Sequence, residues 1–209
     1  MEKQQDMTLL KARSYRSVLT TGFKLYMEKF RQFFKASWLM ALLLSLVLGT
    51  ASGLLLMMYP ASMWAFILLV CMPLAIPVVY ALLRKVLKRH RDFWYTTKGN
   101  FALRLRHCGL LLTVLFASIL LVLLASSVVL IPAAILCLAN QAALQGMMMG
   151  DPSGMPSYMT WLTLATFVLT AFALFYVSQV LLVHYYYACG SIEAREAERQ
   201  KQKQLIQSI

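Results

Sequence analysis

RKVLKRHRDFWYTTKGNFALRLR, residues 84–106, divides the chain into two hydrophobic halves. It holds eight basic residues, a single acid and the aromatic run FWY. Residues 36–83 before it and 107–150 after it contain no Asp, Glu, Lys or Arg. A basic segment between two long uncharged stretches predicts a cytoplasmic loop of a polytopic membrane protein, with a hydrophobic hairpin on each side.

The composition agrees with a bilayer as the solvent. Hydrophobic residues make up 60% of the chain and charged residues 13%, whereas a soluble domain carries about 25% charged residues. The net charge is +12, and all 20 Lys and Arg lie in residues 1–35, 84–106 and 191–209. The other connections, near residue 60 and at 140–158, have none, which is the positive-inside pattern. The charge therefore predicts membrane topology, with both termini in the cytoplasm of a bacterial inner membrane, and no nucleic-acid binding.

We therefore expect an all-α fold, one membrane domain over residues 1–209 with four transmembrane helices in two hairpins. The predicted spans are residues 38–59, 62–83, 109–139 and 158–187, and the cytoplasmic segments are 1–35, 84–106 and 191–209. Twenty-two helical residues extend about 33 Å, enough for a hydrocarbon core of about 30 Å. The third predicted span, residues 109–139, is longer than one straight crossing needs. Pro132 is therefore expected to bend its outer end before an outer loop at 140–158.

The segment before the first span is amphipathic. From residue 9 to residue 35, apolar side chains recur at helical spacing with Lys and Arg between them. This pattern predicts a helix in the plane of the cytoplasmic interface, broken near residues 20–22. A helix docked under the transmembrane bundle is the alternative, and the sequence leaves both open.

Two groups of residues are expected to contact neighbouring helices and lipid. Ser45, Gly49 and Gly53 stand four apart, and small residues at this spacing let helix backbones approach closely. A partner helix in the same chain is favoured over a homodimer. Pro73 and Pro77 predict a bent second span, with a gating hinge as the alternative. Five cations that follow this span are expected to contact anionic lipids: Arg84, Lys85, Lys88, Arg89 and Arg91.

Little in the sequence could carry out chemistry within the membrane. None of the eight acids lies in a predicted span, and three histidines are scattered, so we expect no catalytic residue, cofactor or metal site. A copper site at the methionine run 147–149 is disfavoured, because consecutive helical side chains point apart and no Cys or His accompanies them. Gln179 and His184 are the most polar residues of the fourth span. His184 is expected to bond to a neighbour, and the alternative is an ionisable functional group in the membrane.

The expected function is a non-catalytic scaffold, assembly factor or accessory subunit at the cytoplasmic face, because polar groups gather there. The charged tail, residues 193–209, is predicted to be a helix that could contact a protein partner. The lipid bilayer and its anionic lipids are the other expected partners. The alternative is a small oligomeric transporter or channel lined by hydroxyl side chains such as Ser126, Thr163 and Thr170.

The lead-in KARSYRSVLTTGFKLYMEKFRQFFKASW (residues 11–38) and the ending HYYYACGSIEAREAERQ (residues 184–200) resemble a group of small uncharacterised bacterial inner-membrane proteins. Some members of that group are labelled as carotenoid monooxygenases. Carotenoid cleavage oxygenases hold iron with four histidines on a soluble β-propeller, and this chain has three histidines in all. The resemblance therefore implies a bacterial membrane protein and no particular activity.

Overall fold

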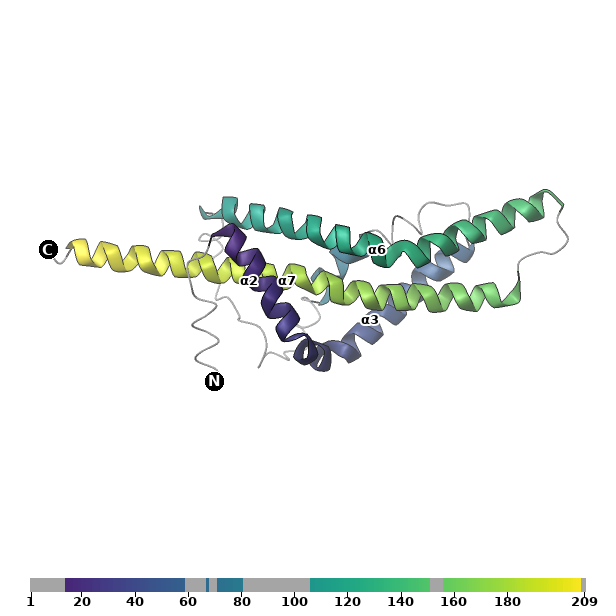
Figure 1. The fold of residues 1–209 in the computed structure, drawn as a ribbon, viewed down its shortest axis with the longest axis horizontal. Coiled ribbons are helices and arrows are strands. Elements are labelled where there is room, and N and C mark those ends of the chain that lie inside the picture. The colour runs from purple at the N-terminus through teal and green to yellow at the C-terminus, as the bar shows by residue number, and fades with distance from the viewer. Residues whose placement is uncertain (1–13, 59–66, 68–70, 81–105, 151–155, 208–209) are drawn as a thin grey trace. The chain divides into compact units, whose positions relative to one another are not determined.

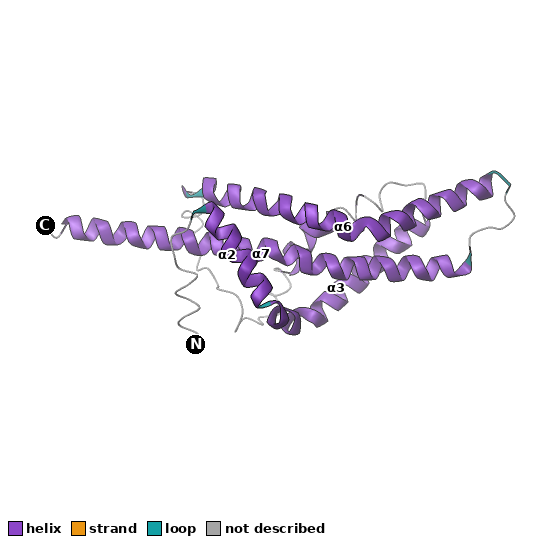
Figure 2. Ribbon diagram, in the orientation of Figure 1, coloured by secondary structure: helices purple, strands orange, loops and turns teal. Residues whose placement is uncertain are grey.

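The structure is a computed structural model that describes residues 14–58, 67, 71–80, 106–150 and 156–207 (Figure 1). The regular secondary structure of these residues is entirely helical (Figure 2). Three described helices are long and apolar enough to cross a membrane: α3 (Phe30–Met58), α6 (Cys108–Met148) and α7 (Ser157–Gln207). The prediction of a helical membrane protein is confirmed at this level.

The predicted second span is described only in part. A short apolar helix, Cys71–Tyr80, carries both Pro73 and Pro77. The rest of residues 62–83, apart from residue 67, lies outside the described residues. The same is true of the proposed lipid-contact cations Arg84, Lys85, Lys88, Arg89 and Arg91.

The first amphipathic helix, α2 (Tyr15–Glu28), begins at a serine cap. The Ser14 side chain accepts a hydrogen bond from the Ser17 amide at 3.4 Å, which satisfies one of the free donors at a helix N-terminus. The predicted break near residues 20–22 is wrong, because α2 continues through Gly22 and ends at Glu28. A single glycine inside a helix costs only about 1 kcal/mol, and Gly22 is buried against a neighbouring helix.

The last two helices are longer than a bilayer is thick. α6 has 41 residues and α7 has 51, so they extend about 61 Å and 76 Å against a hydrocarbon core of about 30 Å. α6 continues through Pro132 and Asn140 to Met148, so the connection that was predicted to begin at residue 140 begins later. α7 joins the predicted fourth span and the charged tail in a single uninterrupted helix.

The chain forms two compact units. Unit 1 comprises Met1–Phe33, Leu87–Leu120 and Val180–Ile209, and its described part holds α2 and one end each of α6 and α7. Unit 2 comprises Phe34–Val86 and Leu121–Gln179, with most of α3, the helix Cys71–Tyr80 and the other parts of α6 and α7.

On α3 and α6 in unit 2, small side chains are common on the buried face and large apolar side chains on the exposed face. The buried stripe of α3 consists mostly of small residues, namely Ser37, Ala41, Ser45, Gly49 and Ser52. On α6 the exposed stripe consists of large apolar residues, namely Leu124, Val128, Ile131, Ile135 and Leu138, and the buried stripe includes Ser126, Ala133 and Cys137. In lipid, hydrophobicity does not distinguish inside from outside, so close packing of small residues selects the buried face.

Candidate functional site on α7

The first half of the α7 segment that lies in unit 1 is covered on nearly every side. From Val180 to Ala194 each side chain is buried or half-buried. A helix that is buried all round has to satisfy its polar side chains within the protein, because water does not reach them. Two polar groups of this region carry the candidate site, His184 and Glu196.

His184 connects three helices through both of its ring nitrogens. Its side chain is fully buried. Nδ1 lies 2.8 Å from the Ser118 hydroxyl oxygen on α6, and Nε2 lies 3.1 Å from the Leu19 carbonyl oxygen on α2. The prediction that His184 bonds to a neighbour is confirmed, and it has two neighbours.

The bonding partners restrict where the protons can be. The Leu19 carbonyl only accepts, so Nε2 carries a proton and donates it. The Ser118 hydroxyl lies 2.8 Å from Nδ1 and 2.7 Å from the Val114 carbonyl oxygen. In a neutral imidazole the hydroxyl donates to Nδ1; in an imidazolium, Nδ1 donates to the hydroxyl, which then donates to Val114. Each ring nitrogen has a partner in both forms, whereas the Val114 carbonyl receives the hydroxyl proton only in the imidazolium form.

Gly22 gives α2 its close approach to the His184 ring. A Cβ atom at position 22 would lie 2.6 Å from His184 Cδ2 and 3.3 Å from Nε2. The ring cannot turn aside freely, since both of its nitrogens are bonded. Glycine at this position therefore allows the Leu19 carbonyl to reach Nε2.

An ion cluster lies further along α7. Glu196 Oε1 is 3.8 Å from Arg106 Nη1, and Glu196 Oε2 is 3.7 Å from His107 Nε2. Both distances are longer than a hydrogen bond. His107 Nε2 and Glu196 Oε2 are buried and have no hydrogen-bond partner among the described residues. Coulomb attraction, rather than a directional hydrogen bond, therefore joins the start of α6 to α7 here.

Unit 2 contains interhelical contacts of the kind expected in a bilayer. Asn140 Nδ2 on α6 donates to the Thr163 hydroxyl on α7 at 3.3 Å, a contact that contributes roughly 0.6 kcal/mol on average in membrane proteins. The aromatic rings of Phe34 and Tyr176 stack with their centroids 5.3 Å apart. These contacts hold α7 between α6 and α3 in this unit.

One polar side chain of α7 has no such partner. The Gln179 side chain is 4% exposed, yet neither Oε1 nor Nε2 has a hydrogen-bond partner among the described residues. The Ser126 hydroxyl of α6 is likewise buried without one. An unsatisfied buried amide costs about 1–3 kcal/mol. The described neighbours of Gln179 therefore give no reason for a polar side chain at this position.

Two kinds of chemistry, nucleophilic catalysis and metal binding, can be compared with the arrangement of these side chains. A serine oxygen 2.8 Å from a histidine nitrogen is the geometry of an activated nucleophile. Ser118 and His184 are both 0% exposed, however, so a substrate carbonyl cannot reach the hydroxyl in this structure. For metals, no group of three or more His, Cys, Asp or Glu side chains lies together in the described part of the chain.

The small residues predicted to pack against a helix lie on the buried face of α3. Ser45 is 3% exposed. A Cβ atom on Gly49 would lie 2.6 Å from the Cα atom of Val168, and one on Gly53 would lie 3.0 Å from Leu164 Cδ2. The helix that these two glycines approach is α7. Ser45 donates its hydroxyl proton to the Leu42 carbonyl of its own helix at 2.9 Å.

The sequence analysis missed the partners of His184 and Glu196. Ser118 follows Val114 and precedes Val122 at steps of four, and all three are fully buried. A single small polar residue, Ser118, within this apolar stretch was the available signal. No local pattern could have paired Leu19 with a histidine 165 residues away.

No protein-family model, curated protein or solved structure matches this chain.

Proposed function

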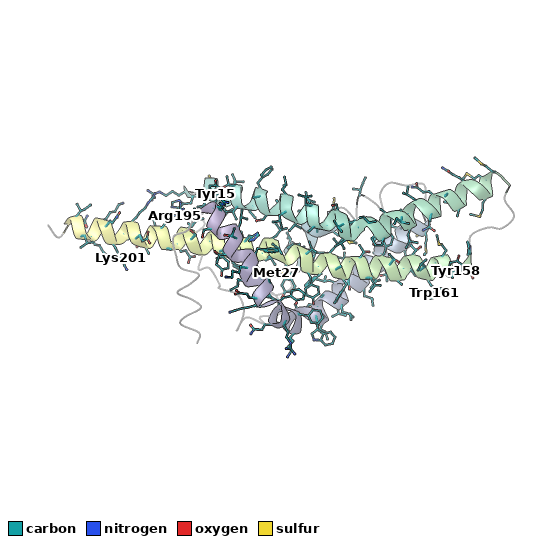
Figure 3. The ribbon with its side chains drawn as sticks, in the orientation of Figure 1. Tyr15, Met27, Tyr158, Trp161, Arg195 and Lys201 are labelled. Carbon is teal, nitrogen blue, oxygen red and sulfur yellow. The ribbon has the colours of Figure 1, made fainter. Side chains whose placement is uncertain are left out.

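We propose that this protein is a non-catalytic integral membrane protein that acts as a scaffold, assembly factor or accessory subunit at the cytoplasmic face. The observation that carries the proposal is the exposed end of α7. Residues 197–207 continue the helix with every side chain exposed. Lys201 extends from this end (Figure 3). A charged helix whose side chains are exposed in the described part of the chain is suited to bind a second protein.

The tail helix is held at its base. Within residues 197–207 one acid, Glu198, is followed by three bases, namely Arg199, Lys201 and Lys203. At the base, Glu196 is paired with Arg106 at 3.8 Å. Because α7 is one continuous helix, this pairing favours a fixed direction for the tail, and a fixed direction lowers the entropy cost of binding a partner.

The topology we propose has four spans in two hairpins in a bacterial inner membrane, with both termini in the cytoplasm and α2 in the interface. The distribution of Lys and Arg supports it, because residues 140–158 have none and the segments 84–106 and 191–209 have twelve. In this arrangement the tail helix, the basic loop and α2 all lie on the cytoplasmic side.

A non-catalytic role is supported by the burial of the one nucleophile-like pair found among the described residues. Ser118 and His184 each have a partner on a neighbouring helix, and both are fully buried. A hydroxyl in this position acts as a link between helices. Labelling of Ser118 by a fluorophosphonate probe tests this part of the proposal.

A small oligomeric transporter or channel is the second candidate, and Gln179 favours it. Its carboxamide lies within the predicted fourth span, buried and without a hydrogen-bond partner among the described residues. Polar groups inside the membrane commonly mark a solute path. Flux of small solutes into liposomes that contain the protein, abolished by Gln179→Leu, would establish this alternative.

Native mass spectrometry of the protein, extracted gently from its own membrane, tests the scaffold proposal. We expect a second polypeptide at fixed stoichiometry, and we expect it to be lost from the variant Arg199→Glu/Lys201→Glu/Lys203→Glu. The control is Met148→Gln, at an exposed position of α6 far along the chain from the tail. A monomer that carries only lipid, or a partner retained by the tail variant, would contradict a partner-binding tail helix.

A further inference from the structure

α2 has apolar side chains that stay exposed in the described part of the chain. Val18, Gly22 and Tyr26 form the buried face. Phe23 and Met27 lie on the neighbouring flank and are 43% and 60% exposed. A surface helix ordinarily has one apolar stripe that faces the core and a polar remainder, so a second, exposed apolar flank needs another environment.

Arg16 lies on this same flank. Residues seven apart in a helix are almost two full turns apart, so Arg16 and Phe23 point in nearly the same direction, and Met27 follows one turn later. Tyr15, at the start of the helix, is 62% exposed, and Figure 3 labels Tyr15 and Met27 on α2. We call Arg16, Phe23 and Met27 the α2 flank; Tyr15 lies about 100° away around the helix, on the side of Gly22 and Tyr26. The α2 flank combines exposed apolar side chains with a cation.

The charge around the α2 flank is positive. Between residues 15 and 31 there are four basic residues and one acid, a net charge of +3. The acid, Glu28, lies 3.9 Å from Lys24, so its charge offsets that lysine. The remaining cations are Arg16, Lys29 and Arg31. Net positive charge beside exposed apolar side chains is complementary to an anionic lipid surface.

The end of α2 is tied to a helix that is apolar enough to cross a membrane. Only Lys29 separates α2 from α3, and the Lys29 amide donates to the Leu25 carbonyl at 3.0 Å. The Tyr26 ring packs against Phe30 and Phe33 in the first turn of α3, with centroids 5.7 Å and 5.4 Å away. α2 therefore lies next to the end of α3, where lipid headgroups are found if α3 spans the bilayer.

From these observations we infer that the α2 flank binds the headgroup region of an anionic bilayer. Phe23 and Met27 enter the boundary between headgroups and acyl chains, and Arg16, with Lys29 and Arg31, contacts the lipid phosphates. The inference rests on the proposed membrane location. It goes beyond that location in naming a lipid class and the residues that select it.

The test uses the full chain in nanodiscs of phosphatidylcholine, with or without phosphatidylglycerol. A polarity-sensitive NBD fluorophore is attached at Met27→Cys or at Lys24→Cys, in a background without the native cysteines whose circular dichroism matches the wild type. We expect emission from position 27 to be blue-shifted and quenched by lipids that carry a doxyl group. Emission from position 24, on the polar flank, stays close to that of the fluorophore in water.

The selectivity for anionic lipid is measured as enrichment of doxyl-phosphatidylglycerol over doxyl-phosphatidylcholine next to position 27. Arg16→Gln should lower this enrichment by up to about fivefold, which corresponds to the ~1 kcal/mol contributed by one cation near the surface. Lys24→Gln is the matched control and should change it little, because Glu28 already offsets the Lys24 charge.

Each other outcome overturns the inference. Equal, water-like emission at the two positions would place the flank in solvent. A blue-shifted probe at position 27 that lipid quenchers do not reach would mean that a protein, or a second copy of this chain, covers the flank. Equal enrichment of the two lipids would refute anionic selectivity. Failure of the chain to enter nanodiscs at all would instead count against the proposed membrane function.

Discussion

At the residue scale, two glycines each lie in close contact with a neighbouring helix. Gly22 adjoins the His184 ring in unit 1, and Gly49 adjoins the Val168 backbone in unit 2. Sequence alone singled out Gly49 because its neighbours at steps of four are also small. It mistook Gly22 for a helix break, because glycine has the same low helix propensity whether it ends a helix or allows a close contact.

Gly22→Ala should destabilise the packing of α2. The added Cβ would lie 2.6 Å from His184 Cδ2, so either the ring loses a hydrogen bond or α2 moves outward, at a cost of roughly 1–3 kcal/mol. Hydrogen exchange of the α2 amides in the full chain should speed up accordingly. Gly109→Ala is the control, because nothing lies within 4 Å of its added Cβ. Equal exchange in the two variants would show that the contact at Gly22 does not hold α2.

Ser118 should not react with a fluorophosphonate probe in the folded protein. Its hydroxyl is fully buried and already bonded to His184, whereas a catalytic serine has to reach the phosphorus atom of the probe. Intact mass spectrometry after incubation reads out the adduct. An adduct at Ser118 that disappears in His184→Phe would identify a working Ser–His pair and would contradict the non-catalytic proposal.

His184 and Gln179 could both be identified from the sequence as unusual residues. Both were singled out because they are polar within an apolar stretch. The need for a partner could be inferred for His184, but the identity of Ser118 and Leu19 depends on which helices adjoin, and that is a tertiary property. The contact between Glu196 and His107 was missed for the same reason, because His107 directly precedes α6 and Glu196 lies far along α7.

At the element scale, helix existence was more predictable than helix boundaries. Uncharged stretches of 20 or more residues identified three of the described helices, because a bilayer requires that length. The turn between α2 and α3 at Lys29 has no local sequence signal. The extension of α6 to Met148 was also unexpected, because Asn140 was interpreted as the start of a loop, whereas it is buried and bonded to Thr163.

Gly49→Ala should loosen α3 from α7 more than Gly53→Ala does. At position 49 the added Cβ meets the backbone of Val168 at 2.6 Å and 2.8 Å, and backbone atoms cannot turn away. At position 53 the nearest atom is the end of the Leu164 side chain at 3.0 Å, which can rotate. We expect a loss of roughly 1–3 kcal/mol at position 49, measured by unfolding in mixed detergent micelles. The reverse order would mean that this crossing is not tightly packed.

At the scale of the whole molecule, an apolar composition and a biased charge distribution account for the class of protein. Three of the four predicted spans correspond to described helices that are long and apolar enough to cross a membrane. What the sequence could not supply is the division into two units. That division depends on packing between distant segments, and side-chain size governs packing in lipid where hydrophobicity is uniform.

The orientation of the chain in the membrane is tested most directly by cysteine accessibility in intact cells. Single cysteines are placed at Met149, 88% exposed, and at Lys201 on the tail helix, in a background without native cysteines. The account predicts that a membrane-impermeant maleimide labels Met149→Cys from outside and labels Lys201→Cys only after the membrane is permeabilised. Labelling of Lys201→Cys in intact cells, or of Met149→Cys only after permeabilisation, would contradict a membrane protein with cytoplasmic termini.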